Sequence, residues 1–134
     1  MAAPPPSLPP KPAASPSSGG AALEAQQALA LWHRVLVDGL NRALPDLTTR
    51  QFALFLEVYL APPPHTVRGL AKTLNMSKPA VTRAVDRLEK LEFVRRKTDE
   101  RDKRSVLVQR SVKGSVFLRE FADMAAVAAR GLGS

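Results

Sequence analysis

Cysteine is absent from this 134-residue sequence, which excludes disulfide bonds, cysteine-based zinc sites and thiol redox sensing. The two histidines, His33 and His65, are isolated, and neither has a neighbour that would complete a metal site or a catalytic pair. The sequence also lacks a glycine-rich phosphate loop and a paired acid cluster. Because no catalytic constellation can be assembled, we expect no enzyme, no cofactor and no metal.

Long hydrophobic runs are missing too. No stretch approaches the roughly 18 uninterrupted apolar residues of a membrane span. The N-terminus lacks the basic start and apolar run of a signal peptide. We therefore expect a soluble cytoplasmic protein, with one domain, additional segments and a modest core.

Positive charge is concentrated in one part of the chain. The net charge is +8, and residues 66–113 alone hold 14 Lys and Arg against 6 Asp and Glu. Such a localised excess is typical of proteins that bind a polyanion, most often nucleic acid. An anionic membrane surface is the competing partner, but this pattern belongs to a folded unit and not to a lone basic helix, so we expect no membrane contact.

The N-terminal region divides into a tail and a helical segment. Residues 1–20 contain seven prolines and little apolar surface, which predicts a disordered tail, either passive or an interaction arm. Residues 21–46 carry a helix that Pro45 ends. The stripe on this helix is wider than packing against one small domain requires, and it forms either a dimer interface or a contact buried in the protein's own core. Its main row is Leu29, Trp32, Leu36 and Leu40, and Leu31, Val35 and Leu44 widen it.

Residues 47–110 have the pattern of a winged helix-turn-helix domain. A helix capped by Thr48 or Thr49 runs to about Leu60, and prolines 62–64 end it. After a very short strand, Thr66 caps a helix over 67–74, and Asn75 suits a left-handed turn. A longer helix follows over 77–91. Two short helices joined by a tight turn, the second carrying cations, form a helix-turn-helix.

The helix predicted over 77–91 has one apolar and one cationic side. Ser77 is its N-cap, and apolar residues recur every three or four positions. Arg83 and Arg87 are neighbours on the other flank and repel each other, and Asp86 and Glu89 offset part of that repulsion. This flank suits an anion, although an ordinary solvated face has the same pattern.

The period changes after this helix. Residues 93–97 and 105–110 have strand character, and the polar segment 98–104 predicts an exposed basic hairpin tip, the wing. Ser111 caps a final helix over about 112–130, within a segment 111–134 that is a second candidate for dimerisation. The predicted fold class is mainly α with a small β-hairpin: a winged helix-turn-helix domain flanked by N- and C-terminal helices.

These segments resemble the MarR family of winged-helix transcriptional regulators over about residues 28–125. The run SKPAVTRAVDRLE at 77–89 is close to the family's S-x-x-x-V-T-R-x-V-D-R-L-E pattern, and Asp102-Lys103-Arg104 fit its D-R/K-R wing signature. Further matches are LTTRQF at 47–52, VRGLA at 67–71 and SVKG at 111–114, although Arg110-Ser111 depart from the usual Leu-Thr.

The resemblance implies a two-fold dimer built by the N-terminal helix with a long fifth and a sixth helix. This sequence stops about one helix short, as in a C-terminally short member. The resemblance therefore reaches the DNA-binding lobe more fully than the homodimer or a small-molecule effector pocket. No residue pattern supports an effector.

The resemblance and the charge pattern together assign roles in binding double-stranded DNA. The 77–91 helix enters the major groove, with Ser77 and Lys78 at phosphates or the first base edges. Thr82 and Arg83 contact base edges, and Arg87 grips a phosphate. In the wing, Arg104 reaches the minor groove, Asp102 orients it by a salt bridge, and Arg101 and Lys103 contact phosphates. For each cation, a solvated surface charge is the alternative.

Two functions of different classes remain. The first is a homodimeric, sequence-specific transcriptional regulator on a pseudo-palindromic site. The second is a winged helix used in a nucleoid or replication-associated protein, or as a protein–protein adaptor, without a specific operator.

Overall fold

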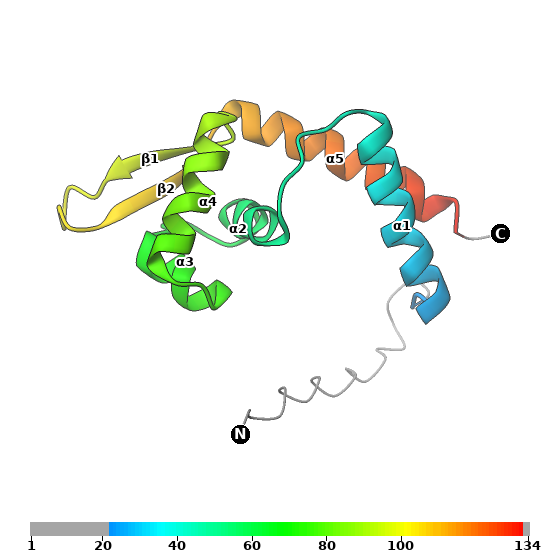
Figure 1. Cartoon of the computed structure of the whole chain (residues 1–134), viewed down its shortest axis with the longest axis horizontal. Helices are drawn as coiled ribbons and strands as arrows, with labels where there is room; N and C mark the ends of the chain where they lie inside the picture. The colour runs from blue at the N-terminus through cyan, green and yellow to red at the C-terminus, as the bar shows by residue number, and fades with distance from the viewer. Residues whose placement is uncertain (1–21, 133–134) are drawn as a thin grey trace, which may run out of the picture.

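The computed structural model describes residues 22–132 and contains, in that part of the chain, five helices and one two-stranded sheet. The tail predicted at 1–20 lies outside the described residues. Figure 1 shows α2, α3, α4 and the hairpin at one end of the molecule, with α5 leading away from them to α1. The elements are α1 (Ala25–Asn41), α2 (Thr49–Leu60), α3 (Val67–Leu74), α4 (Lys78–Lys90), β1 (Val94–Thr98), β2 (Val106–Arg110) and α5 (Val112–Arg130).

Four helices begin at the hydroxyl caps that the sequence predicts. Thr48 accepts a hydrogen bond from the Gln51 backbone N–H, and the Gln51 side chain accepts one from the Thr48 N–H in return. Thr66, Ser77 and Ser111 cap α3, α4 and α5 in the same way, each accepting from a backbone N–H three residues on. The mainly helical fold with a small hairpin is confirmed.

The core lies between α2, α3, α4 and the hairpin. Leu54, Phe55 and Val58 of α2 are fully buried, as are Val81, Val85 and Leu88 of α4. All five phenylalanines of the protein extend this core in one run of ring contacts. The ring centroids of Phe93 and Phe117 lie 4.6 Å apart. This contact fixes the start of α5 to the lobe, the unit formed by α2, α3, α4 and the hairpin.

A second, polar junction joins α5 to the lobe. The Tyr59 hydroxyl accepts a hydrogen bond from the Ser111 N–H at 2.9 Å and lies 2.9 Å from the Phe93 carbonyl oxygen and 3.0 Å from that of Ser111. Gly114 lies against this group. A Cβ atom at Gly114 would come within 2.2 Å of both the Phe93 oxygen and the Tyr59 hydroxyl, so only glycine fits here.

The hairpin pairs β1 with β2 in antiparallel register, from Val94 opposite Arg110 to Thr98 opposite Val106. The very short strand expected at 65–66 is one bridge, between Thr66 and Leu107 on the outer edge of β2. Asn75 ends α3 in the left-handed conformation, with φ of 53°, as predicted. That turn sets α4 across α3.

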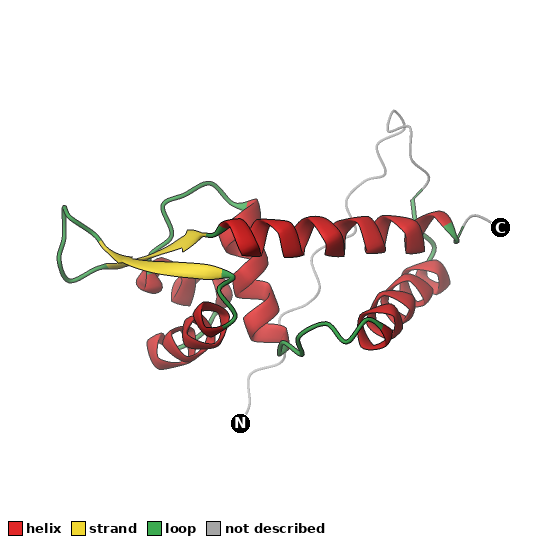
Figure 2. Cartoon of the chain, turned by 90° about the horizontal axis from the view of Figure 1, so that it is seen from above, coloured by secondary structure: helices red, strands yellow, loops and turns green. Residues whose placement is uncertain are grey.

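The N-terminal helix α1 is only partly covered by the rest of the chain. α1 packs against α5 (Figure 2), and Gln27 donates a hydrogen bond to the Leu132 carbonyl. No residue of α1 is buried, and Leu31 and Val35, two of the residues that widen its stripe, are half-buried. The protein's own core therefore covers only one side of the stripe. The four residues of the main row are 59% to 79% exposed; they are Leu29, Trp32, Leu36 and Leu40.

No helix within residues 22–132 combines the length and the apolar character needed to cross a membrane.

Candidate nucleic-acid interface

The cations of α4 face outward because the apolar side of the helix is buried in the core. Val81, Ala84, Val85 and Leu88 are at most 4% exposed. With that face fixed, Lys78, Thr82 and Arg83 are exposed and Arg87 is half-buried. Ser77 accepts a hydrogen bond from the Ala80 N–H at 3.2 Å. The Ser77 hydroxyl, which the sequence analysis assigns to a phosphate or a base edge, therefore also caps the first turn of the helix.

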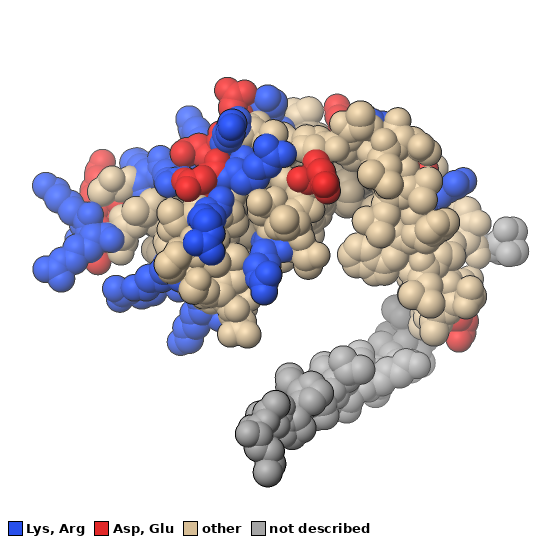
Figure 3. Space-filling model, viewed as in Figure 1, with Lys and Arg blue, Asp and Glu red and all other residues tan. Residues whose placement is uncertain are grey.

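The cations assigned to DNA binding have no acidic partner of their own. The ion pairs found among residues 22–132 involve Arg34, Arg96, Lys113 and Arg119 as the cations. None of these ion pairs involves a cation of the candidate site. Those cations are Lys78, Arg83, Arg87, Arg101, Lys103 and Arg104. Figure 3 shows Lys and Arg gathered over the wing and the α3–α4 region, whereas the face over α1 and α5 is mostly uncharged.

The wing tip differs from the sequence expectation at Asp102. No ion pair joins its carboxylate to the Arg104 side chain in the described part of the chain. Instead, Asp102 accepts a hydrogen bond from the Arg104 backbone N–H at 3.1 Å and one from the Ser105 hydroxyl at 3.2 Å. Asp99 accepts from the Arg101 N–H at 3.0 Å. Short acidic side chains fold back on their own backbone in this way, so these two shape the turn.

The residues thus fall into two groups. α4 carries Ser77, Lys78, Thr82, Arg83 and Arg87, and the loop between β1 and β2 carries Arg101, Asp102, Lys103 and Arg104, all four of which are exposed. The hairpin leaves the end of α4 directly, so both groups lie in the same lobe (Figure 1). No group of three or more metal-ligating side chains gathers in residues 22–132.

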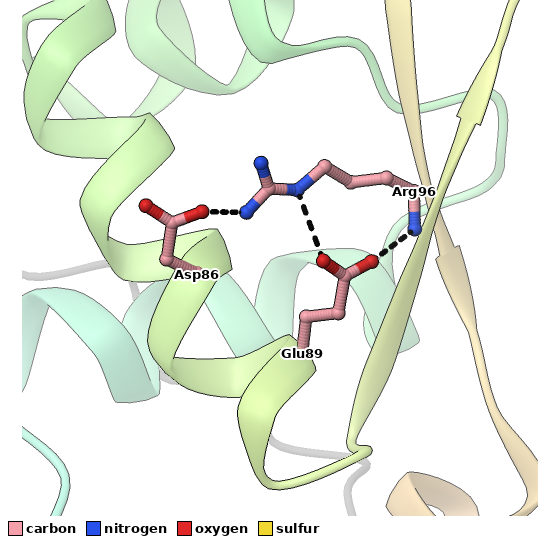
Figure 4. A network of polar contacts seen from close by, with 3 residues as sticks. All are labelled: Asp86, Glu89 and Arg96. Carbon is pink, nitrogen blue, oxygen red and sulfur yellow. Dashed lines mark hydrogen bonds and ion pairs between the residues drawn. The ribbon is translucent and has the colours of Figure 1, made fainter.

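One constellation of this lobe was missed by the sequence analysis. Arg96 of β1 reaches across to Asp86 and Glu89 of α4 (Figure 4). Its Nη2 donates to the Asp86 carboxylate, its Nε lies 3.5 Å from Glu89 Oε1, and its backbone N–H donates to Glu89 Oε2 at 3.1 Å. The signal in the sequence is the pair of acids three apart on a basic helix, Asp86 and Glu89, which also lie beside Arg83 and Arg87.

Comparison with known proteins agrees with this architecture. Residues 46–105 match a family model described as MarR family. No curated protein matches the chain. Among solved structures, the transcriptional repressor CouR bound to a 23-mer DNA duplex is 23% identical, with a TM-score of 0.63 over 79% of this chain and 72% of that chain.

Two further structures are similar to this chain. A mutant MarR from E. coli complexed with operator DNA is 24% identical, with a TM-score of 0.59 over 80% of this chain and 71% of that chain. A MepR–DNA complex from S. aureus is 20% identical, with a TM-score of 0.55 over 74% and 73%. The matched segment, from α2 through β1 and the wing, is thus a winged helix-turn-helix segment of the MarR family.

Proposed function

We propose that this protein is a sequence-specific, double-stranded DNA-binding transcriptional regulator and not an enzyme. In this proposal the 77–91 helix enters the major groove and the 98–104 wing enters the minor groove. The observation that carries it is the set of cations on α4 and the wing that have no acidic partner within the described residues. A free protein that leaves such charges unpaired on one lobe gains when phosphates and base acceptors supply the partners. The DNA complexes among the similar structures support the same partner.

The roles of the α4 residues follow from their place on the helix. Ser77 and Lys78 stand at its N-terminus, where backbone N–H groups and a cation together suit a phosphate. Thr82 and Arg83 project from the exposed side next to that end and are assigned to base edges. Arg87 lies one turn further and is half-buried, which suits a phosphate at the rim of the groove.

The wing residues keep their assigned contacts, with one change of mechanism. Arg104 enters the minor groove, and Arg101 and Lys103 contact phosphates on either side. Asp102 acts through the backbone: its bonds to the Arg104 N–H and the Ser105 hydroxyl set the direction in which the chain carries Arg104.

A homodimer is part of this proposal. The exposed stripe of α1 places Leu29, Trp32, Leu36 and Leu40 in one row at helical spacing. Contiguous exposed apolar rows of this kind mark interaction surfaces, and a second copy related by a two-fold axis covers both rows at once. Two lobes would then face DNA half-sites about one helical turn apart.

The test begins with genomic immunoprecipitation to recover bound DNA. Affinity for a recovered duplex and for a random duplex is then measured across a salt series. We expect Arg83→Ala to weaken binding to the recovered site by about 1–3 kcal/mol and to relax specificity at one base pair. We expect Arg104→Ala to weaken it as well. Arg119→Ala is the control, since Arg119 is an exposed cation on α5, outside the two groups of candidate residues, and its partner is Asp123.

Two results would contradict the proposal. One is equal affinity for recovered and random duplexes, which is the behaviour of a nucleoid protein or an adaptor without an operator. The other is unchanged affinity in both Arg83→Ala and Arg104→Ala.

A further inference from the structure

We propose that Arg96 is a positioning residue that holds the wing at a fixed angle to the recognition helix, so that both elements meet DNA as one unit. This rests on the proposed function, since it concerns the same interface. The cluster formed by Arg96, Asp86 and Glu89, here called the Arg96 cluster, is the structural basis (Figure 4).

The Arg96 cluster attaches β1 to α4 at the level where Val108, the cross-strand partner of Arg96, is still buried in the core. Val94, at the start of β1, is fully buried and therefore anchored by packing. From there β1 runs outward to an exposed tip. Arg96 lies two residues along that path, and its side chain is 29% exposed. The cluster is thus a second attachment between the hairpin and α4, closer to the tip that carries Arg104.

The hairpin is also held from both of its edges at this level. Arg96 and Val108 face each other across the hairpin. Arg96 directs its N–H away from β2 to Glu89, and Val108 directs its N–H away from β1 to the His65 carbonyl at 2.8 Å. One edge is therefore bonded to α4 and the other to the segment before α3. A two-stranded ribbon has little resistance to twisting on its own, and these bonds supply it.

The negative charges of Asp86 and Glu89 provide a test of this role. Asp86 and Glu89 are acidic residues on a helix assigned to a polyanion, so each lowers the attraction to DNA when only charge is counted. Removing either acid should then strengthen binding. If the acids act by fixing Arg96, removing one should weaken binding instead. The two explanations differ in sign.

The first experiment measures whether removal of an acid strengthens or weakens DNA binding. Affinity for the recovered duplex is measured for Glu89→Met, which removes both the charge and the acceptor of the Arg96 N–H. Glu100→Met is the matched control, because Glu100 is an exposed acid of the wing with no hydrogen bond or ion pair among residues 22–132. We expect Glu89→Met to bind about 2- to 5-fold more weakly, the scale of a partly exposed ion pair, and Glu100→Met to bind equally or more tightly.

A charge-preserving variant and a double mutant complete the DNA arm. Arg96→Lys keeps the charge but cannot bridge both carboxylates, and we expect a similar loss. Arg95→Lys, on the neighbouring exposed residue, is its control and should have no effect. The factor lost on Arg104→Ala should be smaller in the Glu89→Met background than in the wild type, because a wing that is no longer held makes less use of Arg104.

The last measurement needs no DNA. Residual dipolar couplings of the hairpin amides in the free protein should fit one orientation relative to α4, and they should average to smaller values in Glu89→Met and Arg96→Lys but not in Glu100→Met. The inference is overturned if the couplings are unchanged in both variants, or if Glu89→Met binds more tightly and the Arg104→Ala factor stays the same. Absence of any preferred duplex for the wild type would instead sink the proposed function, and the couplings would still decide the role of Arg96.

Discussion

Gly114→Ala tests how the DNA-binding lobe is joined to α5. Alanine normally stabilises a helix interior relative to glycine by about 1 kcal/mol. Here the added Cβ would lie 2.2 Å from the Phe93 carbonyl oxygen and from the Tyr59 hydroxyl. The first of these atoms is backbone, and the second is fixed by its bonds to Phe93 and Ser111, so neither can yield cheaply.

The expected cost follows from those two contacts. Overpacking of this kind costs about 1–3 kcal/mol. Displacing Tyr59 adds the loss of its hydrogen bonds, each worth about 0.5–1.5 kcal/mol net. After subtracting the helix gain, we expect the free energy of unfolding to fall by roughly 2–4 kcal/mol. At about 4 °C per kcal/mol, the melting temperature should drop by roughly 8–16 °C.

The assay is thermal and urea unfolding followed by far-ultraviolet circular dichroism. Gly39→Ala is the matched control, since a Cβ at Gly39 would meet only Leu44 Cδ1 at 3.7 Å, an ordinary contact. That variant should be as stable as the wild type or up to about 1 kcal/mol more stable. If Gly114→Ala also proves neutral or stabilising, the close approach at this junction is not what holds α5 to the lobe.

Three further outcomes are expected. Trp32→Asp should raise the dimer dissociation constant by about 30-fold or more in sedimentation, the effect of losing a tryptophan hot spot of about 2 kcal/mol; an unchanged constant would place the interface elsewhere. Lys103→Ala should weaken binding to recovered and random duplexes alike and reduce the salt slope by about 1, whereas a loss confined to the recovered site would mean base readout. Arg110→Met should lower the free energy of unfolding by about 1 kcal/mol, because Arg110 donates to the Val58 and Ala61 carbonyls at the end of α2. An unchanged melting temperature would show that these bonds do not contribute to stability.

The features that sequence predicts best here are local ones. The caps Thr48, Thr66, Ser77 and Ser111 each act within three residues of themselves, so neighbouring letters suffice to find them. The left-handed turn at Asn75 is of the same kind. These signals locate the helix-turn-helix and hence most of the candidate site on α4.

The contacts that sequence analysis missed depend on how strands and helices meet. Arg96 faces α4 only because the hairpin register sends its N–H outward, and nothing in the letters around it fixes that register. Arg110 departs from the family pattern, and its reason is visible only where it closes the end of α2. Asp102 was assigned to the Arg104 side chain, whereas the turn geometry gives it the Arg104 backbone.

Two helices with equally clear apolar stripes have opposite fates in this fold. The stripe of α4 is at most 4% exposed, whereas the main row of the α1 stripe is at least 59% exposed. An apolar period in the sequence indicates that a helix face will be buried, but not whether the same chain or another one buries it. The core residues all belong to α2 through β2, apart from Met124 and Ala128 of α5. The lobe is therefore complete without α1, and a variant such as Trp32→Asp should separate two copies while leaving each lobe folded and able to contact a single half-site.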